Sequence, residues 1–134
     1  MKTTFKQAGI YVTDMQRSIE WYEKVLHLHM VRRLNDLDDW DLVFMADEDE
    51  TGELELIYDP SHPARYELGE NPVHVGFQVA NFLEALEEHR KLGEKFVKLN
   101  LEKEFYFLED PDGYWMEIYP KSFDLKGRIE RDQT

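Results

Sequence analysis

The chain contains no cysteine, and this absence excludes several kinds of chemistry. Without thiols there is no disulfide bond, no thiolate metal ligand and no cysteine nucleophile. Any metal ion would have to be bound through nitrogen and oxygen atoms. Long apolar runs are also missing, because no segment approaches the roughly 18 to 20 consecutive apolar residues of a membrane helix. No charged-then-apolar leader opens the chain, so we expect a soluble cytoplasmic protein.

Positive charge is scarce as well. The 134 residues include 16 Lys and Arg against 29 Asp and Glu, which gives a formal net charge of -13. Since phosphate backbones bind to basic surfaces, this balance argues against nucleic acid as a partner. The acidic runs 36–41 and 47–53 lack the spacing and central glycine of an EF-hand, so we interpret them as solvated loops.

What the chain does contain is enough apolar residues for a packed interior, at 42% of the total. Patterns typical of strands and of helices alternate along it. Strands are predicted at 5–12, 28–34, 40–45 and 53–58, and again at 73–79, 94–98, 104–108 and 114–119. Helices are predicted at 15–26 and 82–92, each after an N-cap residue, Asp14 or Asn81.

The order of elements is the same in both halves. We therefore predict an α+β fold of two tandem β-α-β-β-β modules, at about 4–60 and 72–120. The modules would make one domain over residues 1–122, joined by the proline-containing stretch 59–72 and followed by a polar tail at 123–134.

The repeat also places four potential metal ligands at matched positions. Gln7 falls on His74, because each lies five residues before the valine that ends its strand. Glu55 falls near Glu117, although aligning Gly52 with Gly113 requires a one-residue shift. Two matched pairs of donors are what a pseudo-twofold site needs, so the sequence indicates a metal site where the halves join.

Other interpretations of the same residues remain open. A single histidine is more often a hydrogen-bonded core residue than a ligand, and Gln7 could simply bond to backbone. Glu53 lies on the same strand face as Glu55 and competes with it. His27 and His29 could chelate from one strand face, although His27 sits at the predicted end of the first helix.

Four stretches resemble glyoxalase I and the wider vicinal-oxygen-chelate superfamily. They follow the family order and spacing, and the resemblance covers roughly residues 4 to 120: Val12–Tyr22, Leu54–Tyr58, His74–Phe77 and Leu108–Glu117. The turn Glu109-Asp-Pro-Asp-Gly113 before a strand glutamate is the most specific element. The resemblance implies that the sheets of the two modules form an open cup around a metal site, and that the protein is a homodimer.

By this resemblance, one divalent metal (nickel, cobalt or zinc) is bound by Gln7, Glu55, His74 and Glu117. The implied reaction converts the hemithioacetal of a thiol and a 2-oxoaldehyde such as methylglyoxal into a 2-hydroxyacyl thioester. A proton moves between neighbouring carbons through an enediolate that the metal stabilises. Glu117 is the expected base and Glu55 its partner. The glutamine and glutamate in the first half argue against dioxygenases and fosfomycin-resistance enzymes.

Three residues depart from the glutathione-binding pattern of that family. Tyr11 stands four residues after Gln7, where an arginine is expected, and Asp59 replaces an asparagine. Glu70 stands where some members have a second arginine. These replacements would repel a glutathione carboxylate, so they disfavour glutathione as the thiol carrier and leave other thiols open.

Two rival functions share this predicted fold. One is another metal-dependent epimerase or isomerase. The other, from a different class, is a metal-free protein that binds a drug or another small molecule. Bound metal and its effect on turnover distinguish the enzyme from the binding protein.

Overall fold

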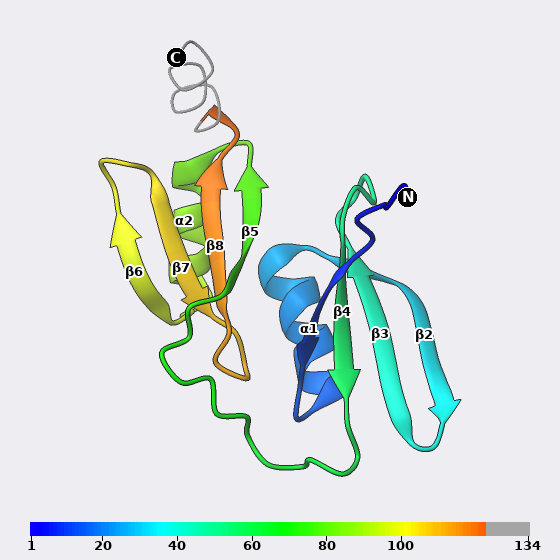
Figure 1. Cartoon of the computed structure of the whole chain (residues 1–134). Helices are drawn as coiled ribbons and strands as arrows, with labels where there is room; N and C mark the ends of the chain where they lie inside the picture. The colour runs from blue at the N-terminus through cyan, green and yellow to red at the C-terminus, as the bar shows by residue number, and fades with distance from the viewer. Residues whose placement is uncertain (123–134) are drawn as a thin grey trace. The chain divides into compact units, whose positions relative to one another are not determined.

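A computed structural model describes residues 1–122 of the chain, and these fall into two units that meet between Glu67 and Leu68. Each unit contains one four-stranded sheet and one long helix (Figure 1). The predicted α+β fold of two β-α-β-β-β modules is therefore confirmed. The predicted polar tail at 123–134 lies outside the described residues. No helix among residues 1–122 is long and apolar enough to cross a membrane.

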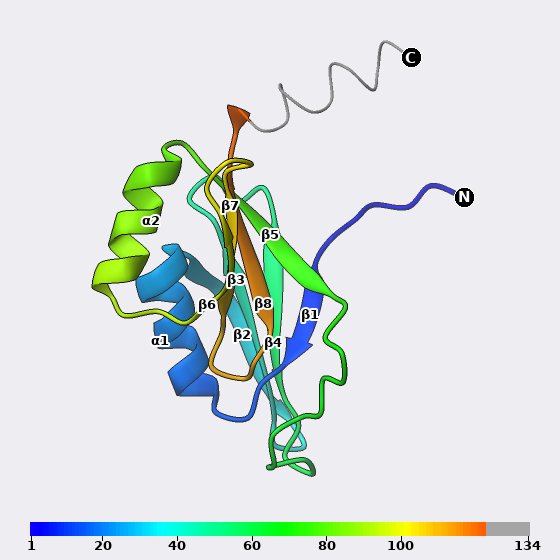
Figure 2. The ribbon, with the colours of Figure 1, turned by 90° about the vertical axis from the view of Figure 1, so that its left-hand side faces the viewer.

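The first unit consists of β1 (Ala8–Tyr11), α1 (Met15–Leu26), β2 (His29–Leu37), β3 (Trp40–Ala46) and β4 (Glu53–Tyr58). Its strands lie in the order β1-β4-β3-β2, with β1 parallel to β4 and the other pairs antiparallel. Helix α1 packs against one face of this sheet, as Figures 1 and 2 show. Apolar side chains from the helix and that face are buried between them.

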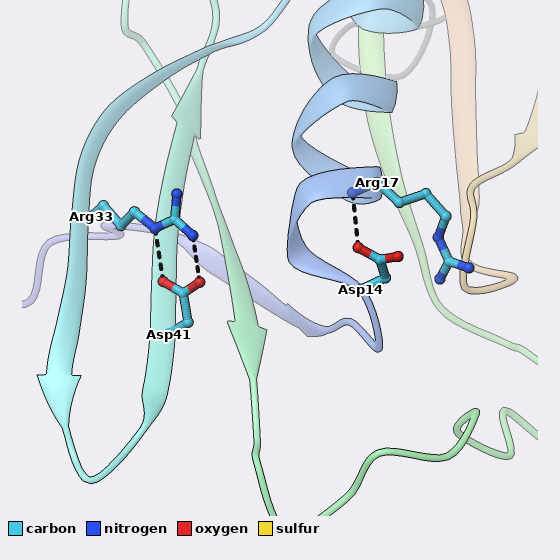
Figure 3. Close-up of polar contacts among 4 residues, drawn as sticks. All are labelled: Asp14, Arg17, Arg33 and Asp41. Carbon is cyan, nitrogen blue, oxygen red and sulfur yellow. Dashed lines mark hydrogen bonds and ion pairs between the residues drawn. The ribbon is translucent and has the colours of Figure 1, made fainter.

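The start of α1 is fixed by the predicted N-cap. The carboxylate of Asp14 accepts a hydrogen bond from the backbone N–H of Arg17 at 3.1 Å (Figure 3). This bond satisfies one of the amides that the first turn of a helix leaves without a partner. The helix ends at Leu26, and its C-cap residue His27 has a left-handed backbone with φ 57°.

The hairpin between β2 and β3 is tighter than the sequence indicated. Asp38 and Asp39 have positive φ values of 51° and 69°, so they form a two-residue turn of the type that matches strand twist. Strand β2 therefore continues to Leu37. The interpretation of residues 36–41 as a solvated loop is wrong, because only Asp38 and Asp39 lie outside the two strands. Arg33 clamps the hairpin through two hydrogen bonds to Asp41, at 3.0 and 2.6 Å (Figure 3).

The second unit consists of β5 (His74–Val79), α2 (Phe82–Lys91), β6 (Phe96–Asn100), β7 (Phe105–Glu109) and β8 (Trp115–Pro120). Its strand order, β5-β8-β7-β6, repeats that of the first unit. Helix α2 buries Phe82, Leu86 and His89, as its spacing predicted. His89 Nδ1 lies 2.7 Å from the hydroxyl of Tyr106 on β7. Burial, with a smaller contribution from Glu88, raises the pKa of Tyr106, so this hydroxyl stays protonated.

The turn before β8 forms as predicted. The backbone N–H of Gly113 donates to the carbonyl of Asp110 at 3.0 Å, and Gly113 has φ 96°. The Asp110 side chain accepts the N–H groups of Asp112 and Tyr114 at 3.0 and 2.8 Å. These bonds compensate for the burial of Asp110 and fix where β8 starts.

Candidate metal centre

Strand register shows which glutamates are equivalent. In the first unit Gly9 on β1 lies opposite Glu55 on β4, and in the second unit Gly76 on β5 lies opposite Glu117 on β8. Each glycine comes two residues after the other candidate ligand, Gln7 or His74. The register therefore matches Glu55 with Glu117 and removes the one-residue shift that the glycine alignment required.

Each of these glycines lies beside its neighbouring glutamate. A Cβ atom added to Gly9 would lie 3.4 Å from Glu55 Oε1 and only 3.1 Å from Ile57 Cδ1. A Cβ added to Gly76 would lie 3.8 Å from Glu117 Oε1 and 3.3 Å from the Tyr119 ring. The carboxylates thus lie beside bare backbone, where a larger residue would press on them or on their neighbours.

In the second unit the two candidate ligands are already in contact. His74 Nε2 lies 3.2 Å from Glu117 Oε1, and the two side chains are 44% and 23% exposed. Phe107 lies opposite Glu117 in the register, and its ring meets the imidazole of His74 edge to face at 5.1 Å. This aromatic contact restricts the orientation of the imidazole beside the carboxylate.

In the first unit the matching residues have no such contact. Gln7 precedes β1, and its Oε1 atom is buried without a hydrogen-bond partner among the described residues. Glu55 is half-buried between the core residues Leu54 and Leu56, and its side chain makes no hydrogen bond or ion pair within residues 1–122. A buried amide oxygen without a donor is costly, so its presence favours a ligand that would bind it.

Glu53, the competing choice in the first unit, has another role. Its two carboxylate oxygens accept hydrogen bonds from the guanidinium of Arg32 at 2.8 and 3.2 Å. The guanidinium also lies 4.0 Å above the ring of Phe44, which is the residue opposite Glu55. Since Glu53 is engaged in this way, Glu55 is the better candidate ligand.

The structure places the four predicted ligands in two pairs, one in each unit. It brings His74 and Glu117 together and puts Glu55 beside Gly9, two residues from Gln7. Within either unit, the described residues contain no group of three or more His, Cys, Asp and Glu side chains that could hold a metal.

A matched row of side chains crosses each sheet and was not predicted from the sequence. In the first sheet Arg32 lies opposite Phe44, which in turn lies opposite Glu55. In the second sheet Lys98 lies opposite Phe107, which in turn lies opposite Glu117. A register shift precedes each cation, between Met30 and Arg32 and between Phe96 and Lys98. Because such a bulge breaks the alternation of side chains, the simple strand pattern could not reveal the row.

Comparison with known proteins identifies the family and close relatives. The sequence model of the Glyoxalase/Bleomycin resistance protein/Dioxygenase superfamily matches residues 4–118. A lactoylglutathione lyase of Pseudomonas aeruginosa is 31% identical over 156 residues, covering 95% of this chain and 86% of that protein. A lactoylglutathione lyase of Escherichia coli O157:H7 is 34% identical over 120 residues, covering 80% and 84%.

Solved structures agree with this assignment. The trypanothione-dependent glyoxalase I of Leishmania major superposes with a TM-score of 0.84 and 26% identity, covering 98% of this chain and 96% of that one. Glyoxalase I of Zea mays gives a TM-score of 0.72 at 26% identity, covering 90% of this chain and 47% of that one.

Proposed function

Because the chain belongs to the glyoxalase/bleomycin resistance protein/dioxygenase superfamily, we propose that it is a metal-dependent lyase of the glyoxalase I type. Its substrate would be the hemithioacetal of a 2-oxoaldehyde and a thiol, and its product a 2-hydroxyacyl thioester. The observation that carries this proposal is the match of Glu55 with Glu117 on the equivalent strands β4 and β8, with Gln7 and His74 each two residues before the glycine that lies opposite the glutamate. The two lactoylglutathione lyases, similar over most of their length, support the same reaction.

The donor atoms suit a divalent metal. We propose that Gln7, Glu55, His74 and Glu117 bind it through one amide oxygen, one imidazole nitrogen and two carboxylates. Such a mixed nitrogen and oxygen set suits nickel, cobalt or zinc. The buried Oε1 of Gln7, which has no hydrogen-bond partner among the described residues, supports this assignment. When bound, the metal would supply Lewis acidity that lowers the energy of negative charge developing on the substrate oxygens.

We assign the proton transfer to Glu117. As a base, its carboxylate would take the proton from the carbon that bears the hydroxyl and the sulfur, and an enediolate would result. The same carboxyl group would return the proton to the neighbouring carbon, so the net reaction is an isomerisation with no oxidant or reductant. His74, whose Nε2 lies 3.2 Å from Glu117 Oε1, would hold the carboxylate in place.

We expect the thiol carrier to differ from glutathione. Tyr11 and Asp59 stand in the first unit where the family resemblance places an arginine and an asparagine, so a carboxylate would lose a cationic partner there. The Leishmania major enzyme, which is trypanothione-dependent, supports a carrier of another kind. The homodimer and the cytoplasmic location implied by the resemblance remain predictions.

Glu117→Gln tests the proposal against a matched control. Glu109→Gln is that control, because Glu109 is also a strand glutamate of the second sheet, with 19% exposure against 23% for Glu117. Protein purified without an affinity-metal column is loaded with nickel, cobalt or zinc and desalted. Metal per chain is then counted by mass spectrometry, and turnover is followed as thioester absorbance.

We expect about one metal per chain and a loss of roughly 10²- to 10⁴-fold in kcat per bound metal in Glu117→Gln, with Glu109→Gln near wild type. Unchanged kcat per metal in Glu117→Gln would remove the assigned base. Failure of the wild-type protein to retain any metal would instead favour the metal-free binding protein.

A further inference from the structure

A side-chain hydrogen bond joins the two chain segments that lead into the ligand-bearing strands of the second unit. The side-chain N–H of Asn71, at Nδ2, donates to the backbone carbonyl of Gly113 at 2.9 Å, and the bond is partly buried. Asn71 lies three residues before His74, which is the first residue of β5. Gly113 lies four residues before Glu117 on β8. The bond therefore connects the approach to one candidate ligand with the approach to the other.

Both ends of this bond belong to turns that hydrogen bonds close. The backbone N–H of Asn71 donates to the carbonyl of Leu68 at 2.9 Å and closes a turn around Gly69. Gly69 and Asn71 have φ 60° and 53°, a left-handed backbone that glycine and asparagine adopt more readily than other residues. At the other end, Gly113 closes the turn that the buried carboxylate of Asp110 holds. The Asn71 side chain thus fixes one closed turn against another.

His74 occupies the end of a strand, where pairing is weakest. The parallel pairing of β5 with β8 begins at His74 and Trp115. Val73, the residue before this first pair, is 73% exposed. Residues at the end of a strand open more readily than central ones, since fewer contacts hold them. The hydrogen bond from Asn71 continues the connection between the two strands beyond the first pair, so it restricts where β5 can start.

We propose that Asn71 positions His74 beside Glu117 by fixing the start of β5 relative to β8. It is a positioning residue that acts through the backbone, and it takes no part in proton transfer. The contacts that depend on it are those of His74 with Glu117, at 3.2 Å, and with the ring of Phe107. This inference rests on the proposed function, since it takes His74 and Glu117 as the second unit's metal ligands.

Two substitutions remove the bond in different ways. Asn71→Gly lacks the amide but adopts φ 53° without strain, so the turn remains. Asn71→Asp keeps the size of the side chain, but its carboxylate has no donor for the Gly113 carbonyl. Asn100→Ala is the control, because it removes another asparagine hydrogen bond of the second unit. That bond comes from the backbone N–H of Lys103 at 2.9 Å and lies between β6 and β7.

Proton NMR of the metal-free protein reports where His74 lies. The wild type should show a nuclear Overhauser effect between the ring protons of His74 and Phe107, because the rings meet edge to face with centroids 5.1 Å apart. We expect both Asn71 variants to lose most of this effect and Asn100→Ala to retain it. Unchanged amide resonances in α2 would show that the unit remains folded. An effect that survives in either Asn71 variant, is equally weak in the control or is absent from the wild type would overturn the proposal.

Cobalt(II) binding connects the placement of His74 with the proposed metal site. Cobalt(II) alone is added to metal-free protein, and its visible absorption gives the Kd. We expect about 10-fold weaker binding in Asn71→Gly and Asn71→Asp, the lower end of the loss that follows removal of groups orienting metal ligands. Asn100→Ala should bind like the wild type.

The two measurements keep this inference separate from the proposed function. If the wild type binds no cobalt while the Asn71 variants lose the Overhauser effect, the proposed function fails and the positioning role stands. If the wild type and both Asn71 variants bind cobalt equally and show the same Overhauser effect, the metal site stands and the positioning role fails.

Discussion

The two units share one scaffold but hold their candidate ligands differently. In the second unit His74 and Glu117 are 3.2 Å apart, and the ring of Phe107 supports the histidine. In the first unit the oxygen of Gln7 is buried without a hydrogen bond among the described residues. The candidate ligands of the second unit are therefore in contact with each other, whereas the first unit retains an unsatisfied acceptor.

The two units therefore position their candidate glutamates to different degrees. A carboxylate held by a histidine has a defined position, which suits a group that must reach a specific proton. A carboxylate without such a partner, like Glu55, depends on what binds to it. The same fold thus offers one preorganised glutamate and one that a ligand would have to position.

The largest expected effect comes from comparing the same substitution at the two glutamates. If Glu55 is mainly a ligand, Glu55→Gln should weaken metal retention but leave kcat per bound metal within about 10-fold of wild type. Glu117→Gln should lose roughly 10²-fold or more by the same measure, because it also lacks the base. Metal titration followed by single-turnover kinetics would check both. Similar losses of kcat per metal in the two variants would mean that the halves share the chemistry equally.

The sequence predicted the common scaffold well because local signals mark it. The helices that follow Asp14 and Asn81 begin as predicted, since their caps are encoded within a few residues. The equivalence of Gln7 and His74 was also visible, because the two residues occupy equal places in a repeat. The contrast between the halves was not visible, since it depends on contacts across strands, such as that of Phe107 with His74.

A smaller difference separates the turns that lead into the last strand of each sheet. Asp47 before β4 accepts the N–H and hydroxyl of Thr51, at 3.0 and 2.7 Å, while Asp110 before β8 binds two N–H groups and is buried. Removing a buried acceptor leaves its donors unsatisfied. We therefore expect Asp110→Ala to cost about 1–3 kcal/mol of unfolding free energy and Asp47→Ala less than about 1 kcal/mol.

The pH dependence of this comparison has a defined sign. Burial raises the pKa of Asp47, but hydrogen bonds from Thr51 and nearby backbone N–H groups outweigh that effect and lower it. A lowered pKa stabilises the folded state above the unfolded pKa of about 4, and the contribution is lost as pH falls through the folded value. Urea unfolding between pH 7 and pH 3 should therefore show that the unfolding free energy lost in Asp47→Ala becomes smaller as the pH falls. A deficit that grows toward acid would contradict this account.

The smallest expected effect concerns the ends of the two helices. Helix α1 has His27 as its C-cap residue, with φ 57°, whereas Gly93 follows α2 with φ 74°. A left-handed backbone strains a residue with a Cβ atom but not glycine. We expect His27→Gly to stabilise the protein by about 0.5 kcal/mol, because relief of strain exceeds the added entropy of the unfolded chain. Gly93→Ala should destabilise it by about 1 kcal/mol.

Urea unfolding at neutral pH measures both changes on the same scale. A destabilising His27→Gly would mean that the imidazole contributes more at the end of α1 than its backbone strain costs. In that event the two helices would be capped by different means, and the contrast between the units would extend from the candidate ligands to the helix ends.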